Sequence, residues 1–248
     1  MITFHSIVRG FEDEFDIIQR NAISSWLKLE PHPEVLLFGN EDHEPGAIEA
    51  ALDFNLPLYS VDRNDRGVPL VRHPIEVARS VSKWQTRCLI NADIILFGKF
   101  TDAVRIVCNQ FDQFLIISRR YRVDIDYRID ILSPKWEARL LEEVKMRGKI
   151  GHGKAVDYFC YRGNFWGDVP EFAVGRTSWD NWLVWKALHE RVPVIDISNF
   201  VMCVHQNHYK RRNSDETKEN RALLGDAAVA GFADVSWQMN EDGSLVEL

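Results

Sequence analysis

The stretch Glu34-Val-Leu-Leu-Phe-Gly39 contains a short, continuously apolar run at residues 35–38, with Pro33 and Gly39 near its ends, which is typical of a parallel strand buried on both faces. Before it, residues 12–29 place apolar side chains on one helical face, and residues 2–8 alternate as a strand does. After it, we expect a helix at 46–54 and a strand at 57–61. This alternation of strand and helix predicts a doubly wound α/β sheet.

The same alternation continues along the chain. Further helices are expected at 74–86, 100–111, 134–147, 179–190 and, with a weaker pattern, 216–224. Further strands are expected at 88–96, 114–118, 158–161, 192–196 and 201–205, with polar loops at 119–131 and 148–153. We therefore expect one α/β domain over residues 1–248, with a mostly parallel central sheet flanked by helices, and with residues from about 210 to 248 packed on it as an extension.

The composition excludes several classes of protein. The net charge of −7 argues against a general nucleic-acid binder, which needs a surplus of lysine and arginine. The four cysteines lie far apart in apolar runs, which indicates buried free thiols in a reducing compartment. The sequence shows neither a secretory leader pattern nor an apolar run of about 18 residues. We therefore expect a cytoplasmic protein without a transmembrane segment, with a peripheral position on the inner face of a membrane as a further option.

Asn91 and Asp93 interrupt the apolar run 88–96 with polar side chains. A carboxylate within a buried strand is costly unless it is paired or binds a metal. Residues i and i+2 of a strand point to one face, so the pair is expected to offer two oxygen ligands to one ion. Oxygen ligands suit Mg²⁺ or Mn²⁺. The structural alternative is that Asp93 caps the next turn or pairs with an arginine.

Asp180 lies in the segment Gly175-Arg-Thr-Ser-Trp-Asp-Asn-Trp-Leu183. Thr177 or Ser178 is a suitable helix cap, with Asp180 in the first turn, and this is a complete structural explanation for the acid. A carboxylate at a helix start that faces an acceptor also has the chemistry to deprotonate a hydroxyl group. The residues alone leave both interpretations open.

His205 and His208 come at the end of the last predicted strand. Their i,i+3 spacing allows an imidazole to reach a metal ion, and a purely structural histidine is the alternative. The chain contains no GxGxxG, P-loop, HExxH or GxSxG motif. These absences argue against a dehydrogenase, a kinase, a zincin protease and an α/β-hydrolase.

Taken together, these segments resemble nucleotide-diphospho-sugar transferases of the GT-A fold, and in particular a bacterial and plant glycosyltransferase-like group. Three motifs carry the resemblance: Asn-Ala-Asp-Ile-Ile-Leu at 91–96, Gly-Arg-Thr-x-Trp-Asp-Asn-Trp-Leu at 175–183 and His-Gln-Asn-His at 205–208. The resemblance implies a GT-A type, Rossmann-like fold. It also implies a glycosyltransferase that moves a sugar from a nucleotide-diphosphate donor to a hydroxyl acceptor, with inversion as the default outcome.

The resemblance also implies roles for individual residues. Asp93 would hold Mn²⁺ or Mg²⁺ on the donor diphosphate, and Asn91 stands at the first position of the family's Asp-x-Asp motif, which often touches ribose. Asparagine supplies no charge, so metal dependence stays open. Asp180 stands where inverting enzymes carry the general base. His205, preferred over His208, would be the last ligand of the metal or diphosphate.

Four further residues are implied to contact substrates. Ser6 and Arg9 follow the first strand, where the nucleotide base usually sits, and Asp42 follows the second, where an acid often contacts base or ribose. Arg120 would meet the donor phosphates or the acceptor. The acceptor stays open between a lipid-linked glycan, a protein and a small molecule, and an oligomer is compatible with the sequence.

Two other functions fit the sequence less well. A non-catalytic module that binds sugar nucleotides or glycans is compatible with Asn91 in the metal motif. A sugar-phosphate nucleotidyltransferase shares the fold type, but it usually has a glycine-rich basic loop after its first strand. Here that loop is Arg9-Gly-Phe-Glu-Asp13, which is acidic.

Overall fold

The computed structural model describes residues 1–208 and 214–248, except for the side chains of 214–216. Its helices are α1 (Asp13–Leu27), α2 (Ala47–Phe54), α3 (Arg72–Val81), α4 (Lys99–Gln110), α5 (Trp136–Arg147), α6 (Trp179–His189) and α7 (Ser214–Leu223). Its strands are β1 (Ile2–Ile7), β2 (Glu34–Phe38), β3 (Leu58–Tyr59), β4 (Thr86–Ile90), β5 (Ile94–Ile95), β6 (Phe114–Ile117), β7 (Arg120–Val123), β8 (Lys149–Ile150), β9 (Tyr158–Arg162), β10 (Val194–Asp196), β11 (Cys203–Gln206), β12 (Trp237–Met239) and β13 (Leu245–Glu247).

In the described chain, the central sheet has nine strands in the order β13-β12-β10-β6-β9-β4-β1-β2-β3. The pairs β1–β2, β1–β4, β2–β3, β6–β10 and β10–β12 are parallel. Only β9, which lies between β4 and β6, and the edge strand β13 run antiparallel to their neighbours. The expected mostly parallel α/β sheet is therefore confirmed.

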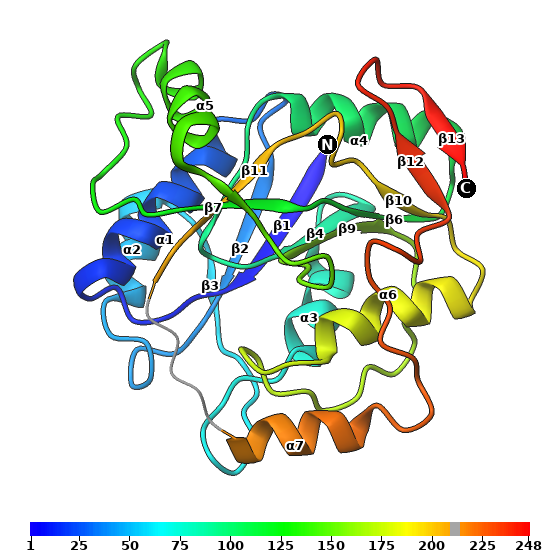
Figure 1. Cartoon of the computed structure of the whole chain (residues 1–248). Coiled ribbons are helices and arrows are strands. Elements are labelled where there is room, and N and C mark those ends of the chain that lie inside the picture. The colour runs from blue at the N-terminus through cyan, green and yellow to red at the C-terminus, as the bar shows by residue number, and fades with distance from the viewer. Residues whose placement is uncertain (209–213) are drawn as a thin grey trace.

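Helices cover both faces of this sheet (Figure 1). Along β4 the buried side chains alternate, with Cys88 and Ile90 on one face and Leu89 on the other. The first face packs on α1, α2 and α4, and the second on α3 and α6. Because both faces are covered, most side chains of the central strands are apolar, which is the pattern that residues 35–38 display.

The predicted strand at 88–96 is wrong in one respect that matters for the site. The strand β4 ends at Ile90, Asn91–Asp93 form a turn, and β5 belongs to a second sheet of order β5-β11-β7-β8. Helix α1 stabilises this change of sheet, because Nε1 of Trp26 donates a hydrogen bond to the Ile94 carbonyl at 2.8 Å. An apolar run shows that a segment is buried, but it does not show in which sheet each half pairs.

The segments predicted as polar loops contain two short strands. Residues 120–123 form β7, which pairs with β11, and residues 149–150 form β8, which pairs with β7. The strands β12 and β13 near the C-terminus were also not predicted. All four are short strands near sheet edges, with exposed positions that hide the alternation of apolar and polar residues.

The expected extension begins at residues 210–213, which lie outside the described residues. Its weak helix is confirmed as α7, and β12 then joins the central sheet beside β10. Among the described helices, none combines the length and the apolar character that crossing a bilayer requires.

Candidate active site

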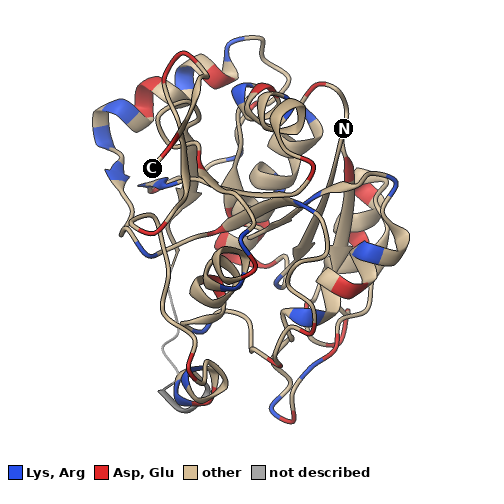
Figure 2. Ribbon diagram, turned by 90° about the vertical axis from the view of Figure 1, so that its right-hand side faces the viewer, with Lys and Arg blue, Asp and Glu red and all other residues tan. Residues whose placement is uncertain are grey.

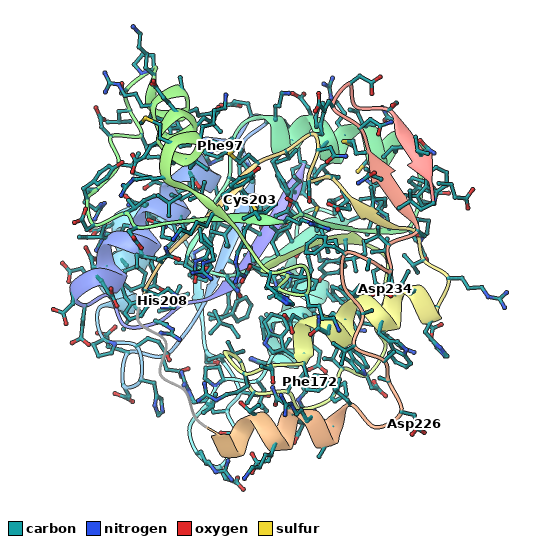
Figure 3. All side chains as sticks on the ribbon, in the orientation of Figure 1. Phe97, Phe172, Cys203, His208, Asp226 and Asp234 are labelled. Atoms are coloured by element: carbon teal, nitrogen blue, oxygen red, sulfur yellow. The ribbon has the colours of Figure 1, made fainter. Side chains whose placement is uncertain are left out.

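The candidate site lies where the central sheet meets the small second sheet. Asp93 follows the carboxyl end of β4, and His205 lies on β11, which pairs antiparallel with β5 so that His205 is in register with Ile94. Figure 3 shows His208 just beyond the end of β11, close to α1. The turn after β4 and the end of β11 therefore bring together residues that are more than 100 positions apart in the sequence.

Asp93, His205 and His208 form one cluster. The Nε2 atoms of His205 and His208 lie 3.3 Å and 3.0 Å from Oδ2 of Asp93. Both imidazole rings are buried, and they stack with centroids 5.5 Å apart. One potential ligand atom from each residue lies within 4.8 Å of the others, which is the arrangement of a three-ligand metal site.

A buried amide network fixes the backbone of this cluster. The Gln206 backbone N–H donates to the Asp93 carbonyl at 3.1 Å, and the Gln206 side chain donates to the Ile18 carbonyl at 2.8 Å. Asn21 on α1 donates to the side-chain carbonyl of Gln206 at 3.1 Å. These bonds hold β11, α1 and the Asp93 turn in one arrangement.

The chemistry of the cluster fits a divalent cation. Burial alone would raise the pKa of Asp93, but the charge and hydrogen bonds of His205 and His208 hold it below its ordinary value, so the side chain is a carboxylate. Its second oxygen, Oδ1, is buried and has no hydrogen-bond partner among the described residues. A buried carboxylate oxygen without a donor is stabilised when it binds a metal ion.

The two histidines do not fit a metal ion equally well. Nδ1 of His205 is buried and has no partner within the described part of the chain. A metal on Nε2 of His205 would leave a buried N–H at Nδ1 without an acceptor, whereas ligating histidines usually donate that hydrogen. The structure therefore favours His208 over His205 as the nitrogen ligand.

Asn91 is placed differently from the expectation that it shares a strand face with Asp93. Its Nδ2 donates to Oδ1 of Asp157 at 3.0 Å, and its backbone N–H donates to the Asp157 carbonyl at 2.9 Å. The reason is the turn at 91–93, which removes the i,i+2 geometry of a strand. Asn91 therefore orients Asp157 in this structure.

Arg120 interacts with three acids of the site, which are Asp157, Asp93 and Asp180. It is buried at the start of β7, and its guanidinium forms an ion pair with Asp157. Burial lowers the pKa of Arg120, while the negative charges of Asp93 and Asp180 raise it. Arg120 therefore lies within electrostatic reach of both carboxylates. Because Gly151 has no side chain, its backbone can lie close to Arg120. A Cβ atom at position 151 would lie 2.9 Å from Cγ of Arg120.

Asp180 occupies a different environment from Asp93. Burial raises the pKa of Asp180 to about 6, against the lowering effect of backbone N–H groups of Asn181, Asp180 and Val156 and of the Arg120 charge. Ser178 occupies the cap position of α6 with φ of 92° and makes no side-chain cap bond. The predicted capping by Ser178 is therefore not observed. Left-handed backbone at a non-glycine residue beside an acid marks a strained segment that the surroundings must hold.

Two buried asparagines hold the start of α6. Nδ2 of Asn181 donates to the carbonyls of Lys154 and Ala230 at 2.9 and 2.8 Å. Asn220 on α7 accepts a hydrogen bond from the backbone N–H of Ala173 at 2.9 Å and donates to the Ala173 carbonyl at 3.0 Å. The segment that precedes Asp180 is therefore tied to α7, and Figure 3 shows Phe172 between α6 and α7.

Ser6 and Arg9 lie at the end of β1, as expected, in contrasting positions. Ser6 is fully buried and donates to the Ile90 carbonyl at 2.6 Å, so it ties β1 to β4, and contact with a nucleotide would require that bond to open. Arg9 is exposed and lies over the ring of Phe15, 4.8 Å from its centroid. The centroids of the Phe15 and His208 rings are 5.1 Å apart, which places Arg9 beside the cluster of Asp93, His205 and His208.

Asp42 is exposed in the turn after β2, and no contact among the described residues joins it to the cluster. The buried acid of this loop is Glu44 instead, which pairs with Arg63 and accepts from the Asn40 backbone N–H at 2.8 Å. The structure therefore separates Asp42 from the other predicted site residues.

A mostly apolar hollow opens beside Asn91, at the carboxyl ends of β1 and β4. Its lining comes from those strand ends, the start of α3 and the start of α6: Ile7, Val71, Leu89, Ile90, Asn91, Val174 and Trp179. Ligands of open α/β sheets bind outside the carboxyl ends of the strands.

Sequence reasoning missed the supporting residues of the site. Asp157 stands directly before a buried strand, which is a signal that the sequence offered. Gln206, Asn181 and Asn220 are buried amides whose partners are backbone atoms distant in the sequence, and no local pattern reveals such partners.

No protein-family model matches the chain, and neither does any curated protein. Among solved structures, S. aureus TarS 1–349 in complex with UDP-GlcNAc is similar with a TM-score of 0.52 and 13% identity, over 94% of this chain and 68% of that chain. The same protein in complex with UDP gives a TM-score of 0.39 and 13% identity, over 49% of this chain and 36% of that chain. In that second alignment the chain spans little more than a third of the TarS 1–349 chain.

At this identity the similarity concerns the fold alone. The alignment over 94% of the chain shows that the protein shares the fold of that TarS structure, which confirms the expected α/β architecture.

Proposed function

We propose that the protein is a glycosyltransferase that transfers a sugar from a nucleotide-diphosphate donor to a hydroxyl acceptor. The observation that carries this proposal is the opposite behaviour of two acids near Arg120. The pKa of Asp93 is held below its ordinary value, while that of Asp180 is raised to about 6. Two acids whose pKa values are pushed apart are suited to different roles in one reaction.

In this proposal the donor lies across the carboxyl ends of β1 and β4. The small hollow beside Asn91 would border the nucleoside, and Arg9 and Arg120 would attract the diphosphate. The similarity to TarS solved with UDP-GlcNAc supports a sugar nucleotide as the donor. The adjacent cluster of Asp93 and His208 then lies where the diphosphate would be.

Asp93 and His208 would hold Mn²⁺ or Mg²⁺, with His205 donating a hydrogen bond to Asp93. The bound ion would supply Lewis-acid stabilisation for the nucleoside diphosphate as it leaves. Asn91 and Arg120 keep Asp157 in place between the two parts of the site.

Asp180 would be the general base. With a pKa of about 6, it is ionised near neutral pH and is basic enough to accept the proton of the acceptor hydroxyl as its oxygen attacks the anomeric carbon. Attack from the side opposite the leaving diphosphate inverts that carbon. The hydrogen bonds of Asn181 and Asn220 would hold this base in position.

A thermal-shift screen of nucleoside diphosphates and their sugars, with Mn²⁺, Mg²⁺ or EDTA, tests the proposal. A ligand that binds only the folded protein raises the melting temperature by mass action. We expect a metal-dependent shift with UDP or another nucleoside diphosphate, followed by release of that diphosphate from its sugar. If no nucleotide produces a shift, the donor site does not exist and the proposal fails.

A further inference from the structure

One surface of the molecule combines exposed cations with exposed large apolar side chains. It consists of two exposed residues that precede α5, the outer side of α5 and the strand β8. We call it the basic face: Leu132, Lys135, Lys145, Met146, Lys149 and Ile150. Figure 2 shows blue and red segments interspersed over the ribbon, so the net charge of −7 is not gathered in one element. Within residues 132–154, however, six lysines and arginines face three glutamates.

The packing of α5 determines which side it presents to solvent. Trp136, Leu140 and Val144 are buried at intervals of four residues and pack on the second sheet. Lys145 and the other exposed residues of α5 therefore point outward, and Lys135, directly before the helix, is exposed as well. Figure 1 shows α5, in green, at the outer edge of the molecule beyond β7.

The apolar side chains of the basic face are unusually exposed. Leu132 is 81% exposed, Met146 is 76% exposed and Ile150 is 58% exposed. Large apolar side chains that stand in solvent beside lysines are typical of a helix that lies in the interface of a membrane.

The cations of the basic face are only partly offset by neighbouring acids, of which Asp124 lies within electrostatic reach of Arg147. Arg122 of β7 is directly opposite Lys149 of β8, and both are exposed. Like charges directly opposite on paired strands are destabilising unless an anion lies nearby. Glu143 does not offset them, because it pairs with Arg147 and accepts a hydrogen bond from Tyr127. Glu142 is the one exposed acid on α5.

Helix α2 shows that exposed apolar residues alone do not produce this combination. Ile48 and Leu52 are 51% and 75% exposed, but their helix carries Glu49 and Asp53 and no lysine or arginine. The cations therefore distinguish the basic face and indicate a negatively charged partner.

We propose that the basic face binds an anionic lipid surface. Lysines attract anionic headgroups, and Leu132, Met146 and Ile150 enter the boundary between headgroups and acyl chains. A membrane is favoured over an acidic protein because the exposed apolar side chains stand singly among cations along the chain. The basic face also adjoins the site, since the Gly151 backbone N–H donates to the Arg120 carbonyl at 2.8 Å. If the proposed function is correct, an acceptor in the membrane would arrive beside Arg120.

Co-sedimentation of the full chain with vesicles tests this proposal without any need for activity. The vesicles are phosphatidylcholine alone, or phosphatidylcholine and phosphatidylglycerol in equal parts. We expect binding only to the mixed vesicles, weakened by salt. The triple variant K135Q/K145Q/K149Q should lose roughly 10²-fold in partitioning, because each cation near an anionic surface contributes about fivefold.

Two pairs of matched variants separate the lipid interpretation from others. L132S/M146S should weaken vesicle binding, whereas I48S/L52S on the acidic helix α2 and K28Q should leave it unchanged. Melting temperatures of all variants check that each one folds. The proposal is overturned if mixed vesicles bind no better than neutral ones, or if the triple variant binds as well as the parent. Equal binding of L132S/M146S, together with tight binding of polyglutamate, would assign the surface to an acidic protein instead.

Discussion

Asp93 and Asp180 are both partly buried acids near Arg120, yet the fold surrounds them with different chemistry. Two imidazoles meet one oxygen of Asp93 and leave the other without a partner. Asp180 instead meets backbone N–H groups at the start of α6, and burial outweighs them. In the proposed reaction, one carboxylate would stay ionised to hold a cation, and the other would stay basic enough to accept a proton. The comparison shows that the chemistry of two acids follows from their neighbours and not from residue type alone.

The largest effect is expected from Asp93→Asn, because this change removes the only charge that the cluster offers to a cation. Metal-dependent binding of the donor should disappear, and turnover should fall roughly 10⁴-fold, as several kcal/mol of stabilisation of the leaving group are lost. Calorimetric titration of UDP with and without Mn²⁺ measures the first effect. Unchanged metal-dependent affinity in this variant would remove Asp93 from the metal site.

Asp180→Asn should separate the effect of Asp180 on turnover from the effect of Asp93 on donor binding. The variant keeps the shape of the side chain, so we expect donor affinity like that of the parent and turnover reduced roughly 10³-fold. Steady-state kinetics and the same titration measure both quantities. A loss of folding, seen as a lower melting temperature with weakened donor binding, would instead support a purely structural role at the start of α6.

Variants of the two histidines test which of them binds the metal ion together with Asp93. His208→Gln should weaken metal affinity by roughly 10- to 100-fold, and His205→Gln should weaken it less, because His205 acts on Asp93 and not on the ion. Titration with Mn²⁺ in the presence of UDP compares them. A greater loss in His205→Gln would reverse the assignment and restore the preference that the sequence resemblance implied.

The pH dependence of turnover tests whether Asp180 is the general base. Asp180 accepts a proton only when ionised, and its pKa is raised to about 6, so turnover at saturating donor should rise with pH up to about 6 and then level off. Below that pH the rate should fall about tenfold per unit. Donor binding measured over the same range controls for protonation of the histidines. A flat profile across this window would contradict the general-base role.

The smallest effect is expected from Asn220→Ala, which releases the segment before Asp180 from α7 without touching either acid. Turnover should fall roughly tenfold, with an unchanged Michaelis constant for the donor, since a misplaced base costs orientation and not binding. Asn240→Ala is a matched control, because Asn240 bonds only within the C-terminal hairpin turn. Equal effects of the two changes would show that Asn220 has only a general structural role.

The sequence predicted the layers of the fold better than the places where strands change sheet. Residues 35–38 and 114–117 are apolar because both faces of the central sheet are covered, and that pattern is local. The break after Ile90 depends on Trp26 of α1, which contacts the Ile94 carbonyl. A contact between residues so far apart leaves no trace in the local pattern.

The sequence also predicted some residues of the site and not others. Asp93, His205 and His208 were expected together, and the structure places them in one cluster. Asp42 was expected nearby and lies apart, because the turn after β2 points its carboxylate to solvent. Asp157 was missed, since its importance comes from Arg120 on β7 and Asn91 in the turn after β4, which approach it from distant parts of the sequence.

The most direct test of the division between the two acids is one titration series with UDP, with and without Mn²⁺, on the parent, Asp93→Asn and Asp180→Asn. We expect the metal to strengthen UDP binding in the parent and in Asp180→Asn, but not in Asp93→Asn. If the metal strengthens binding equally in all three proteins, or in none of them, the two acids do not have the separate roles assigned to them.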